Sequence, residues 1–271
     1  MYQIFDTLAD YNQYTDNGTN LTSGVTYYVK EDSSSHFQTN NIDGEEKVYN
    51  MMDDEDLIDF IERNITSITI PSGTIKISNS AFRGCSVLTN ITIPDSVTSI
   101  EQTAFYNCTR LTNIIIPDSV TSIGQSAFRG WSGLTSVTIG SGVTSIGDNT
   151  FYGCSKLTSI TIPNGVTSIS VQTFYGCYSL TRLNSDADGL FNIPNNVTSI
   201  GVAAFNGCSG LTSVTIPDSV TIIGKGAFSG CSNLAVLNIP KGVIQIGNFA
   251  FAYCRLLTSI FIPETIKPNL L

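Results

Sequence analysis

Conventional catalytic groups are scarce in this chain. Its 271 residues include a single histidine, His36, so a Ser-His-Asp or Cys-His site can draw on that residue alone. His36 stands in a polar stretch, where a solvated histidine is the simpler alternative. No C-x-x-C pair and no phosphate loop of Walker spacing is present. We therefore expect no enzyme activity, and no cofactor apart from calcium at one acidic loop.

Charge is also sparse, and it is unevenly placed. Charged residues make up 13% of the chain, and the net charge is −9. Residues 1–64 hold 14 acidic and 3 basic residues, whereas residues 65–271 hold 8 acidic and 10 basic ones. This asymmetry predicts a domain boundary near residue 64. It also argues against a nucleic-acid partner, which would need a basic stripe or patch.

Long apolar runs and targeting signals are missing as well. No window approaches 18 consecutive apolar residues, so we expect no membrane insertion. The first residues, 1–6, lack the basic and apolar regions of a signal peptide. Three locations stay open: inside the cell, outside it by a route that needs no such signal, or on a particle released by lysis.

What the chain has is a repeat. Phenylalanines recur every 23 residues, with one interval of 31, and a fixed period of this size predicts stacked supersecondary units. We expect these phenylalanines to form the structural core. They are Phe82, Phe105, Phe128, Phe151, Phe174, Phe205, Phe228 and Phe251.

One unit shows how the repeat should fold. Leu157, Ile160 and Ile162 match the leucine-rich pattern L-x-x-L-x-L, with the isoleucines on one side of a strand. Pro163 should end that strand, and the segment before Phe174 should form a short helical or 3₁₀ turn. Comparable starts from residue 65 to residue 257 predict nine turns. We expect an α/β repeat solenoid, mostly β, whose stacked coils share one core.

The residues of the repeat carry a family resemblance. The run Ile93–Ile100, followed by Ala104-Phe105 and Cys108, resembles the BspA-type leucine-rich repeats of bacterial and protozoan surface proteins. The resemblance covers residues 65–271. It implies a right-handed, curved solenoid that serves in adhesion or ligand binding, and it implies no catalytic residue.

Two coils depart from the pattern. Trp131 replaces the cysteine of the repeat and Gly140 replaces its proline, so that unit should be locally irregular. An insertion at residues 184–191 accounts for the 31-residue interval and should bulge from one edge of the solenoid.

Residues 1–50 lack the period, and residues 1–64 should form a small, acidic α+β module. Residues 25–29 have the composition of a strand, and Phe37 stands on a second one. Asp53 to Arg63 has the apolar spacing of a helix that would cap the first repeat. The run from Tyr27 to Gly44 also resembles N-terminal segments of gut-phage tail proteins that carry such repeats.

Seven cysteines invite a disulfide or metal interpretation, but they follow the repeat spacing apart from the insertion and Trp131. An odd count in one column makes a poor disulfide framework. We expect buried free thiols that fill space as small apolar groups.

The insertion offers one metal-site hypothesis. Asn184, Asp186 and Asp188 alternate like the first half of a calcium loop. The position of the bidentate acid holds Asn195 instead, and a hydrated acidic loop is the alternative.

Polar side chains should line the outward face of the main sheet. Hydroxyl arrays suit an exposed strand face, and they can also bind a ligand. Tyr152 and Tyr175, on another side, could form an aromatic contact patch or simply shield the buried phenylalanines. The predicted ligand-binding face comprises Thr138, Ser159, Thr161, Arg182, Ser213 and Thr215.

Two functions fit these observations. The first is an adhesion solenoid on a bacterial surface that recognises a host or cell-surface protein or glycan. The alternative is a phage virion component for host attachment, anchored to other virion proteins through residues 1–64.

Overall fold

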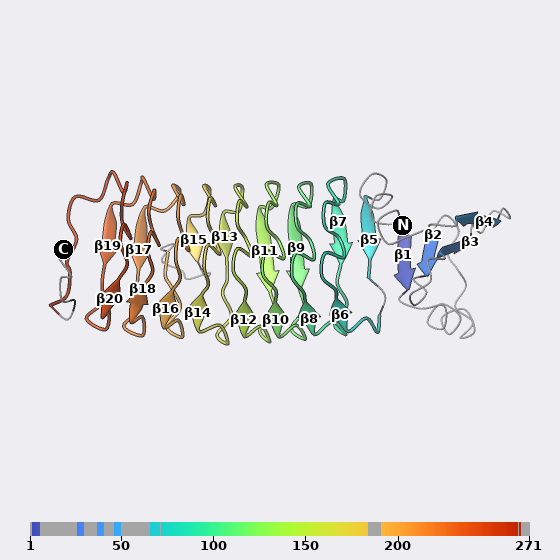
Figure 1. The fold of residues 1–271 in the computed structure, drawn as a ribbon, viewed down its shortest axis with the longest axis horizontal. Helices are drawn as coiled ribbons and strands as arrows, with labels where there is room; N and C mark the ends of the chain where they lie inside the picture. The colour runs from blue at the N-terminus through green and yellow to red at the C-terminus, as the bar shows by residue number, and fades with distance from the viewer. Residues whose placement is uncertain are drawn as a thin grey trace.

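The computed structural model describes residues 2–5, 26–29, 37–40, 46–49, 66–70, 72–183, 191–264 and 266, with side chains from residue 66 onward. From β5 to β20 the chain forms eight pairs of short strands, and all of their pairings are parallel. The coils stack along one axis that is nearly straight in Figure 1, with little of the curvature that the family resemblance implies. The predicted repeat solenoid, mostly β, is thus confirmed.

The two strands of each coil belong to two separate rows. The first row contains β5 (Ser67–Thr69), β7 (Asn90–Thr92), β9 (Asn113–Ile116), β11 (Ser136–Ile139), β13 (Ser159–Ile160), β15 (Arg182–Leu183), β17 (Ser213–Thr215) and β19 (Val236–Asn238). The second row contains β6 (Lys76–Ile77), β8 (Ser99–Ile100), β10 (Ser122–Ile123), β12 (Ser145–Ile146), β14 (Ser168–Ile169), β16 (Ser199–Ile200), β18 (Ile222–Ile223) and β20 (Gln245–Ile246).

Fewer turns form than the sequence predicts. Between β5 and β19 the chain completes about seven turns, and the expected ninth unit at 257–262 contains no strand. In the described chain these residues make no backbone hydrogen bond to β19.

Alternation of burial explains why the first-row strands form where they do. In β11 the side chains of Val137 and Ile139 are buried, whereas those of Ser136 and Thr138 are exposed. Branched apolar residues that alternate with small polar ones suit a pleated sheet with one face on the core. Gly140 follows directly, and a Cβ there would lie 2.3 Å from the carbonyl oxygen of Pro117. Glycine is therefore needed where the other units carry proline.

The turn that carries each phenylalanine is not helical, contrary to expectation, and no helix occurs anywhere in the described residues. In the coil of Phe105, Thr103 and Asn107 both adopt a left-handed conformation, with φ of 52° and 61°. Equivalent positions repeat this pair in the other coils. Left-handed residues two on either side of the phenylalanine stop a helix from propagating.

This turn instead bonds to the next coil. The backbone N–H groups of Thr103, Phe105 and Asn107 donate to carbonyl oxygens of the following coil at 2.9, 2.9 and 2.8 Å. The same three donors recur along the stack, and all of them point toward the C-terminal end. The turns thus form a third hydrogen-bonded column beside the two strand rows.

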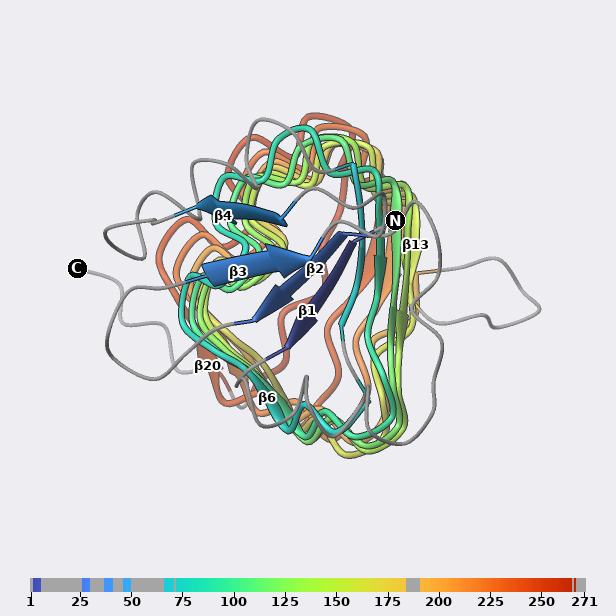
Figure 2. The same ribbon diagram turned by 90° about the vertical axis from the view of Figure 1, so that its right-hand side faces the viewer.

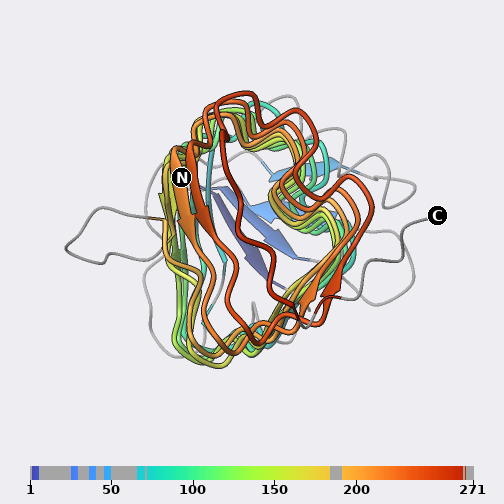
Figure 3. The ribbon, with the colours of Figure 1, turned by 90° about the vertical axis from the view of Figure 1, so that its left-hand side faces the viewer.

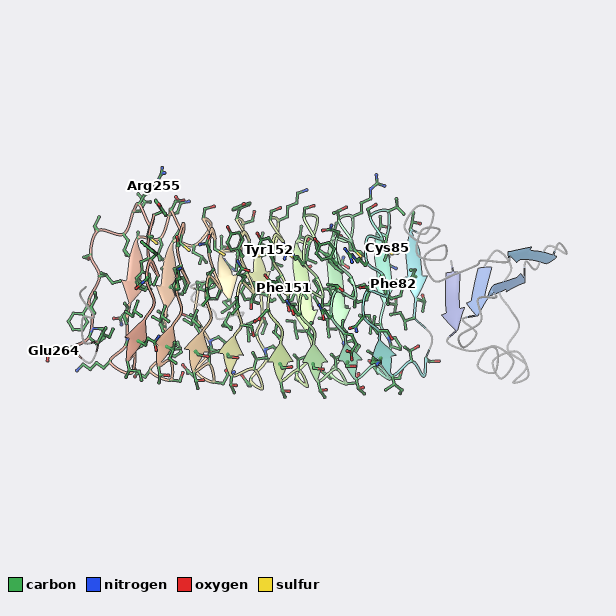
Figure 4. All side chains as sticks on the ribbon, in the orientation of Figure 1. Phe82, Cys85, Phe151, Tyr152, Arg255 and Glu264 are labelled. Carbon is green, nitrogen blue, oxygen red and sulfur yellow. The ribbon has the colours of Figure 1, made fainter. Side chains whose placement is uncertain are left out.

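The phenylalanines stack into one continuous ladder through the interior. Successive ring centroids lie 5.1 to 5.9 Å apart, with the planes within 17° of parallel. The 31-residue interval does not break it, because Phe174 and Phe205 are 5.3 Å apart. Phe251, in the last coil, is only partly buried, whereas the other seven are buried. Figure 4 marks Phe82 and Phe151 at two levels of this ladder.

Two of the N-terminal strands extend the first row, and two others form a separate hairpin. The elements are β1 (Tyr2–Phe5), β2 (Thr26–Val29) and a hairpin of β3 (Phe37–Asn40) and β4 (Glu46–Tyr49). β1 pairs in parallel with β5, so the sheet order is β2-β1-β5-β7. Figure 2 shows β1 to β3 crossing the N-terminal end of the stack. The predicted strands at 25–29 and Phe37 are confirmed, whereas the predicted helix at 53–63 lies outside the described residues.

Candidate ligand-binding surfaces

The predicted ligand-binding face lies on the outward side of the first strand row. Thr138, Thr161, Thr215, Ser159 and Arg182 are exposed, and Ser213 is half-buried. The register of β11, β13 and β15 aligns Ser159 and Arg182 of this set with each other and with Ser136, which lies outside the set. The parallel stack thus brings side chains 23 residues apart into direct contact range.

The insertion divides this face. β15 does not pair with β17 in the described sheet; instead Leu183 bridges Phe191, and Asn192 bridges Thr215. Phe191 is 1% exposed and packs edge-on against Phe205 with ring centroids 5.3 Å apart. It therefore belongs to the core, which corrects its assignment to a bulging loop: its large apolar side chain anchors the end of the insertion. Ser213 and Thr215 consequently lie beyond a break from Ser159 and Arg182.

Other threonines hydrogen-bond one coil to the next, a role that the sequence does not reveal. The hydroxyl of Thr135 donates to the carbonyl oxygen of Thr112 in the preceding coil at 2.9 Å, and Thr158 donates to Thr135 in the same way at 3.3 Å. A second such ladder runs through Thr98, Thr121 and Thr144 at the second row. These hydroxyls are therefore already hydrogen-bonded within the protein.

The predicted face differs in this respect. Within the described residues, the hydroxyls of Thr138, Ser159 and Thr161 make no hydrogen bond to the protein. They alternate along the strand with buried isoleucine and valine, so they point to solvent. Their donors and acceptors are available to a ligand.

A polar groove flanks the break at the insertion. It has a volume of about 750 Å³, and asparagine dominates its lining. The side chain of Asn196 stabilises the fold, because its amide donates to the carbonyl oxygen of Val166. The sequence analysis does not predict this groove, although the 31-residue interval marks the insertion beside which it lies. Its lining residues are Asn164, Asn192, Ile193, Pro194, Asn195, Asn196, Thr215 and Pro217.

The cysteines are free thiols, six of them buried, as the sequence predicts. The structure adds a role for them: the thiol of Cys108 donates to the carbonyl oxygen of Phe82 in the preceding coil at 3.0 Å, and Cys177 does the same to Phe151 at 3.2 Å. Trp131 takes the place of cysteine in this column, and its indole N–H donates to the equivalent oxygen of Phe105. Each of these groups ties two coils together.

Four of the buried thiols are unsuited to nucleophilic chemistry. Burial raises the pKa of Cys154 to about 12, and it raises the pKa values of Cys177, Cys208 and Cys231 as well. Because the thiolate is the reactive form, these thiols are held in their inert state at neutral pH. Cys254, in the last coil, is partly exposed, and burial raises its pKa too.

The calcium hypothesis falls on Asn184, Asp186 and Asp188, which lie outside the described residues. Elsewhere, within residues 66–183 and 191–264, no group of three or more histidine, cysteine, aspartate or glutamate side chains is arranged to hold a metal ion. The part of the chain that the structure describes also contains no helix long and apolar enough to cross a membrane.

Tyr152 and Tyr175 do form a pair. Their rings stack at a centroid distance of 4.6 Å with planes 2° apart, and both side chains are half-buried. They follow Phe151 and Phe174 directly in sequence, but these two phenylalanines are fully buried in the core whereas the tyrosines are not. Each ring covers one face of the other, which leaves the ring edges and the hydroxyls for a partner to meet.

Fold and sequence comparisons agree on the class of protein, a parallel solenoid of leucine-rich repeats. A family model for the BspA type leucine rich repeat region matches residues 59–181 and 189–268, and the chain belongs to this family. No curated protein matches the chain.

Several solved structures are similar to the chain. A leucine-rich cell surface protein of Faecalibacterium prausnitzii is 31% identical, with a TM-score of 0.51, over 77% of this chain and 57% of that one. A Treponema pallidum leucine-rich repeat protein is 28% identical, with a TM-score of 0.47, over 62% and 64% of the two chains. The similarity thus spans less than two thirds of either relative.

Proposed function

We propose that this chain is a non-catalytic adhesion or ligand-binding solenoid, displayed on a bacterial surface, that recognises a protein or glycan on another cell. The observation that carries the proposal is the row of uncommitted polar groups along β11, β13 and β15. Thr138, Ser159 and Arg182 stand on these hydrogen-bonded strands, Thr161 follows β13 directly, and no hydrogen bond joins any of these four side chains to another. A rigid array loses little entropy on binding, which favours recognition of an extended ligand. The F. prausnitzii relative, a cell surface protein, supports the proposed location.

The experiment measures binding of the fluorescently labelled full chain to intact mammalian epithelial cells and to intact bacteria by flow cytometry. We expect saturable binding that unlabelled chain displaces. The variant Thr161→Ala/Arg182→Ala should weaken it, whereas Gln125→Ala/Lys225→Ala, at exposed positions away from this face, should not. No saturable binding to either cell type, or equal loss in both variants, would contradict the proposal.

The virion alternative makes a different prediction about location. A phage component anchored through residues 1–64 would be found on filtered particles from a producing culture, whereas a surface adhesin would be found on the cell envelope. Immunogold labelling of both fractions distinguishes the two.

A further inference from the structure

One edge of the solenoid is basic and free of acid, in a chain whose net charge is −9. This edge, here called the Phe edge, is the seven-residue turn from each core phenylalanine to the leucine that follows it, from residues 82–88 in the first coil to residues 251–257 in the last. No aspartate or glutamate occurs in any of the eight turns. Five basic residues do, and four of them lie in the first four coils. They are Arg83, Arg110, Arg129, Lys156 and Arg255.

Two of these arginines are built into a ladder with the tyrosines. The guanidinium carbons of Arg83 and Arg129 lie 5.3 and 5.9 Å from the ring centre of Tyr106, which belongs to the coil between them. Arg129 also lies 4.2 Å from the ring centre of Tyr152, and Tyr152 stacks on Tyr175. Five consecutive coils thus contribute one side chain each to this ladder. In order, these side chains are Arg83, Tyr106, Arg129, Tyr152 and Tyr175.

Stacking fixes these side chains without using up their hydrogen-bonding groups. A guanidinium over an aromatic face keeps its N–H groups free at the rim, and the phenol hydroxyls lie at the ring edge. Arg83 is exposed and the other four side chains are half-buried, so each reaches solvent. Because the arginines are already ordered, binding an anion costs less side-chain entropy than at a flexible surface.

We propose that the Phe edge binds a linear acidic polysaccharide that carries an anionic group on alternate sugars. The inference rests on the proposed function. It names one class of ligand, and it adds the Phe edge as a second binding surface beside the predicted ligand-binding face. Coils stack roughly 4.8 Å apart, so Arg83 and Arg129, two coils apart, are separated by about 10 Å. Two successive pyranose rings of an extended chain span about the same length. The phenol of Tyr106 then faces the neutral sugar between the two acids.

Spacing and geometry disfavour two other polyanions. Phosphates of a nucleic-acid strand repeat roughly every 3.4 Å, far more densely than these cations. Bases also bind by stacking on open aromatic faces, whereas arginines cover both faces of Tyr106, and Arg129 and Tyr175 cover the two faces of Tyr152. An extended acidic peptide presents side chains on one face about every 7 Å, out of step with the ladder.

The test uses the full chain and fragments of hyaluronan, in which one sugar of each pair carries a carboxylate, with dextran as the neutral comparison. Affinity is measured by calorimetry at two salt concentrations. We expect hyaluronan but not dextran to bind, and binding to weaken at higher salt. Arg83→Gln/Arg129→Gln should lower the affinity roughly tenfold or more, because charge-assisted hydrogen bonds are lost. Lys76→Gln/Lys241→Gln removes the same charge elsewhere and should leave the affinity unchanged.

A thermal melt of each variant shows whether it folds. If Arg129→Gln lowers the melting temperature, Arg83→Gln alone, at an exposed position of the ladder, should still weaken hyaluronan binding. No hyaluronan binding, equal loss in the Lys76/Lys241 variant, or equal affinity for duplex DNA or poly-glutamate would overturn the inference. Cell binding that persists without hyaluronan binding would leave the proposed function standing, whereas loss of both would remove both.

Discussion

The indole nitrogen of Trp131 donates to the carbonyl oxygen of Phe105, the acceptor position that a cysteine thiol uses in the neighbouring coils. The ring also packs edge-on against Phe105 and Phe128, with centroid distances of 6.0 and 5.2 Å. The one irregular residue of this column therefore keeps its hydrogen bond and adds buried aromatic area. At this position the acceptor of the hydrogen bond stays the same from coil to coil, although the donor side chain changes from cysteine to tryptophan.

Replacing Trp131 separates these two contributions. We expect Trp131→Ala to cost about 3–5 kcal/mol in the free energy of unfolding, because it removes both the buried ring and the donor. Trp131→Cys should cost less, since a thiol makes this bond in the adjacent coils. Urea denaturation followed by circular dichroism measures both. Equal losses for the two variants would show that the thiol does not take over the bond.

Two threonines of one strand region should respond differently to the same substitution. Thr135→Val removes the hydroxyl that donates to Thr112 and should lower the free energy of unfolding by about 0.5–1.5 kcal/mol. Thr138→Val removes a hydroxyl with no bond in the described protein, so stability should stay within about 0.5 kcal/mol. Only Thr138→Val should reduce cell binding. Thermal unfolding and the flow-cytometry assay provide the two measurements, and the reverse pattern would contradict the assignment.

Stability at high pH should report on the buried thiols. Burial raises the pKa of Cys154 to about 12 from its ordinary value of 9.0, so the folded chain holds this proton more tightly than the unfolded chain does. The resulting stabilisation is complete below pH 9 and is lost as the pH rises from about 9 to 12. Unfolding free energies over this range should therefore fall more steeply for the native chain than for Cys154→Ala. Parallel slopes would argue against a protonated buried thiol.

The calcium loop at Asn184, Asp186 and Asp188 stays a prediction that titration can decide. If these side chains converge on one ion, isothermal titration of the full chain should show heat at millimolar calcium, and Asp186→Ala should abolish it. Asp148→Ala changes the charge equally outside the insertion and serves as the control. No heat, or heat that survives Asp186→Ala, supports the hydrated loop.

Much of the fold can be predicted because the stack repeats one pattern of burial. Phe105 and Phe128 stand 23 residues apart in sequence and 5.7 Å apart in space, so the period gives the contact directly. Isoleucines two residues apart likewise predict the strands, because side chains at that spacing point to the same face of a strand.

Other features arise only from contacts between coils. Thr103, Gln172 and Ala203 are left-handed, although their side chains disfavour that conformation, and each backbone N–H bonds the next coil. Local sequence predicts a helical turn there, and tertiary bonding overrides it.

The candidate surfaces show the same limit. The sequence separates Arg83 from Arg129 by 46 positions, so no basic stripe is evident until the coils are stacked. Likewise, nothing in the composition distinguishes Thr135, whose hydroxyl serves the fold, from Thr138, whose hydroxyl is free for a ligand.

The N–H groups of the turn column all point one way, and their peptide dipoles therefore add along the stack instead of cancelling. The N-terminal end of the column gathers partial negative charge from its carbonyl groups, and the C-terminal end gathers partial positive charge at Phe249, Phe251 and Tyr253. Figure 3 shows the solenoid from this C-terminal end. A coil can join such a column in one orientation only. Whole 23-residue units can therefore be gained or lost while every other coil keeps the same bonding partners, so duplication can change the length of the molecule without redesigning it.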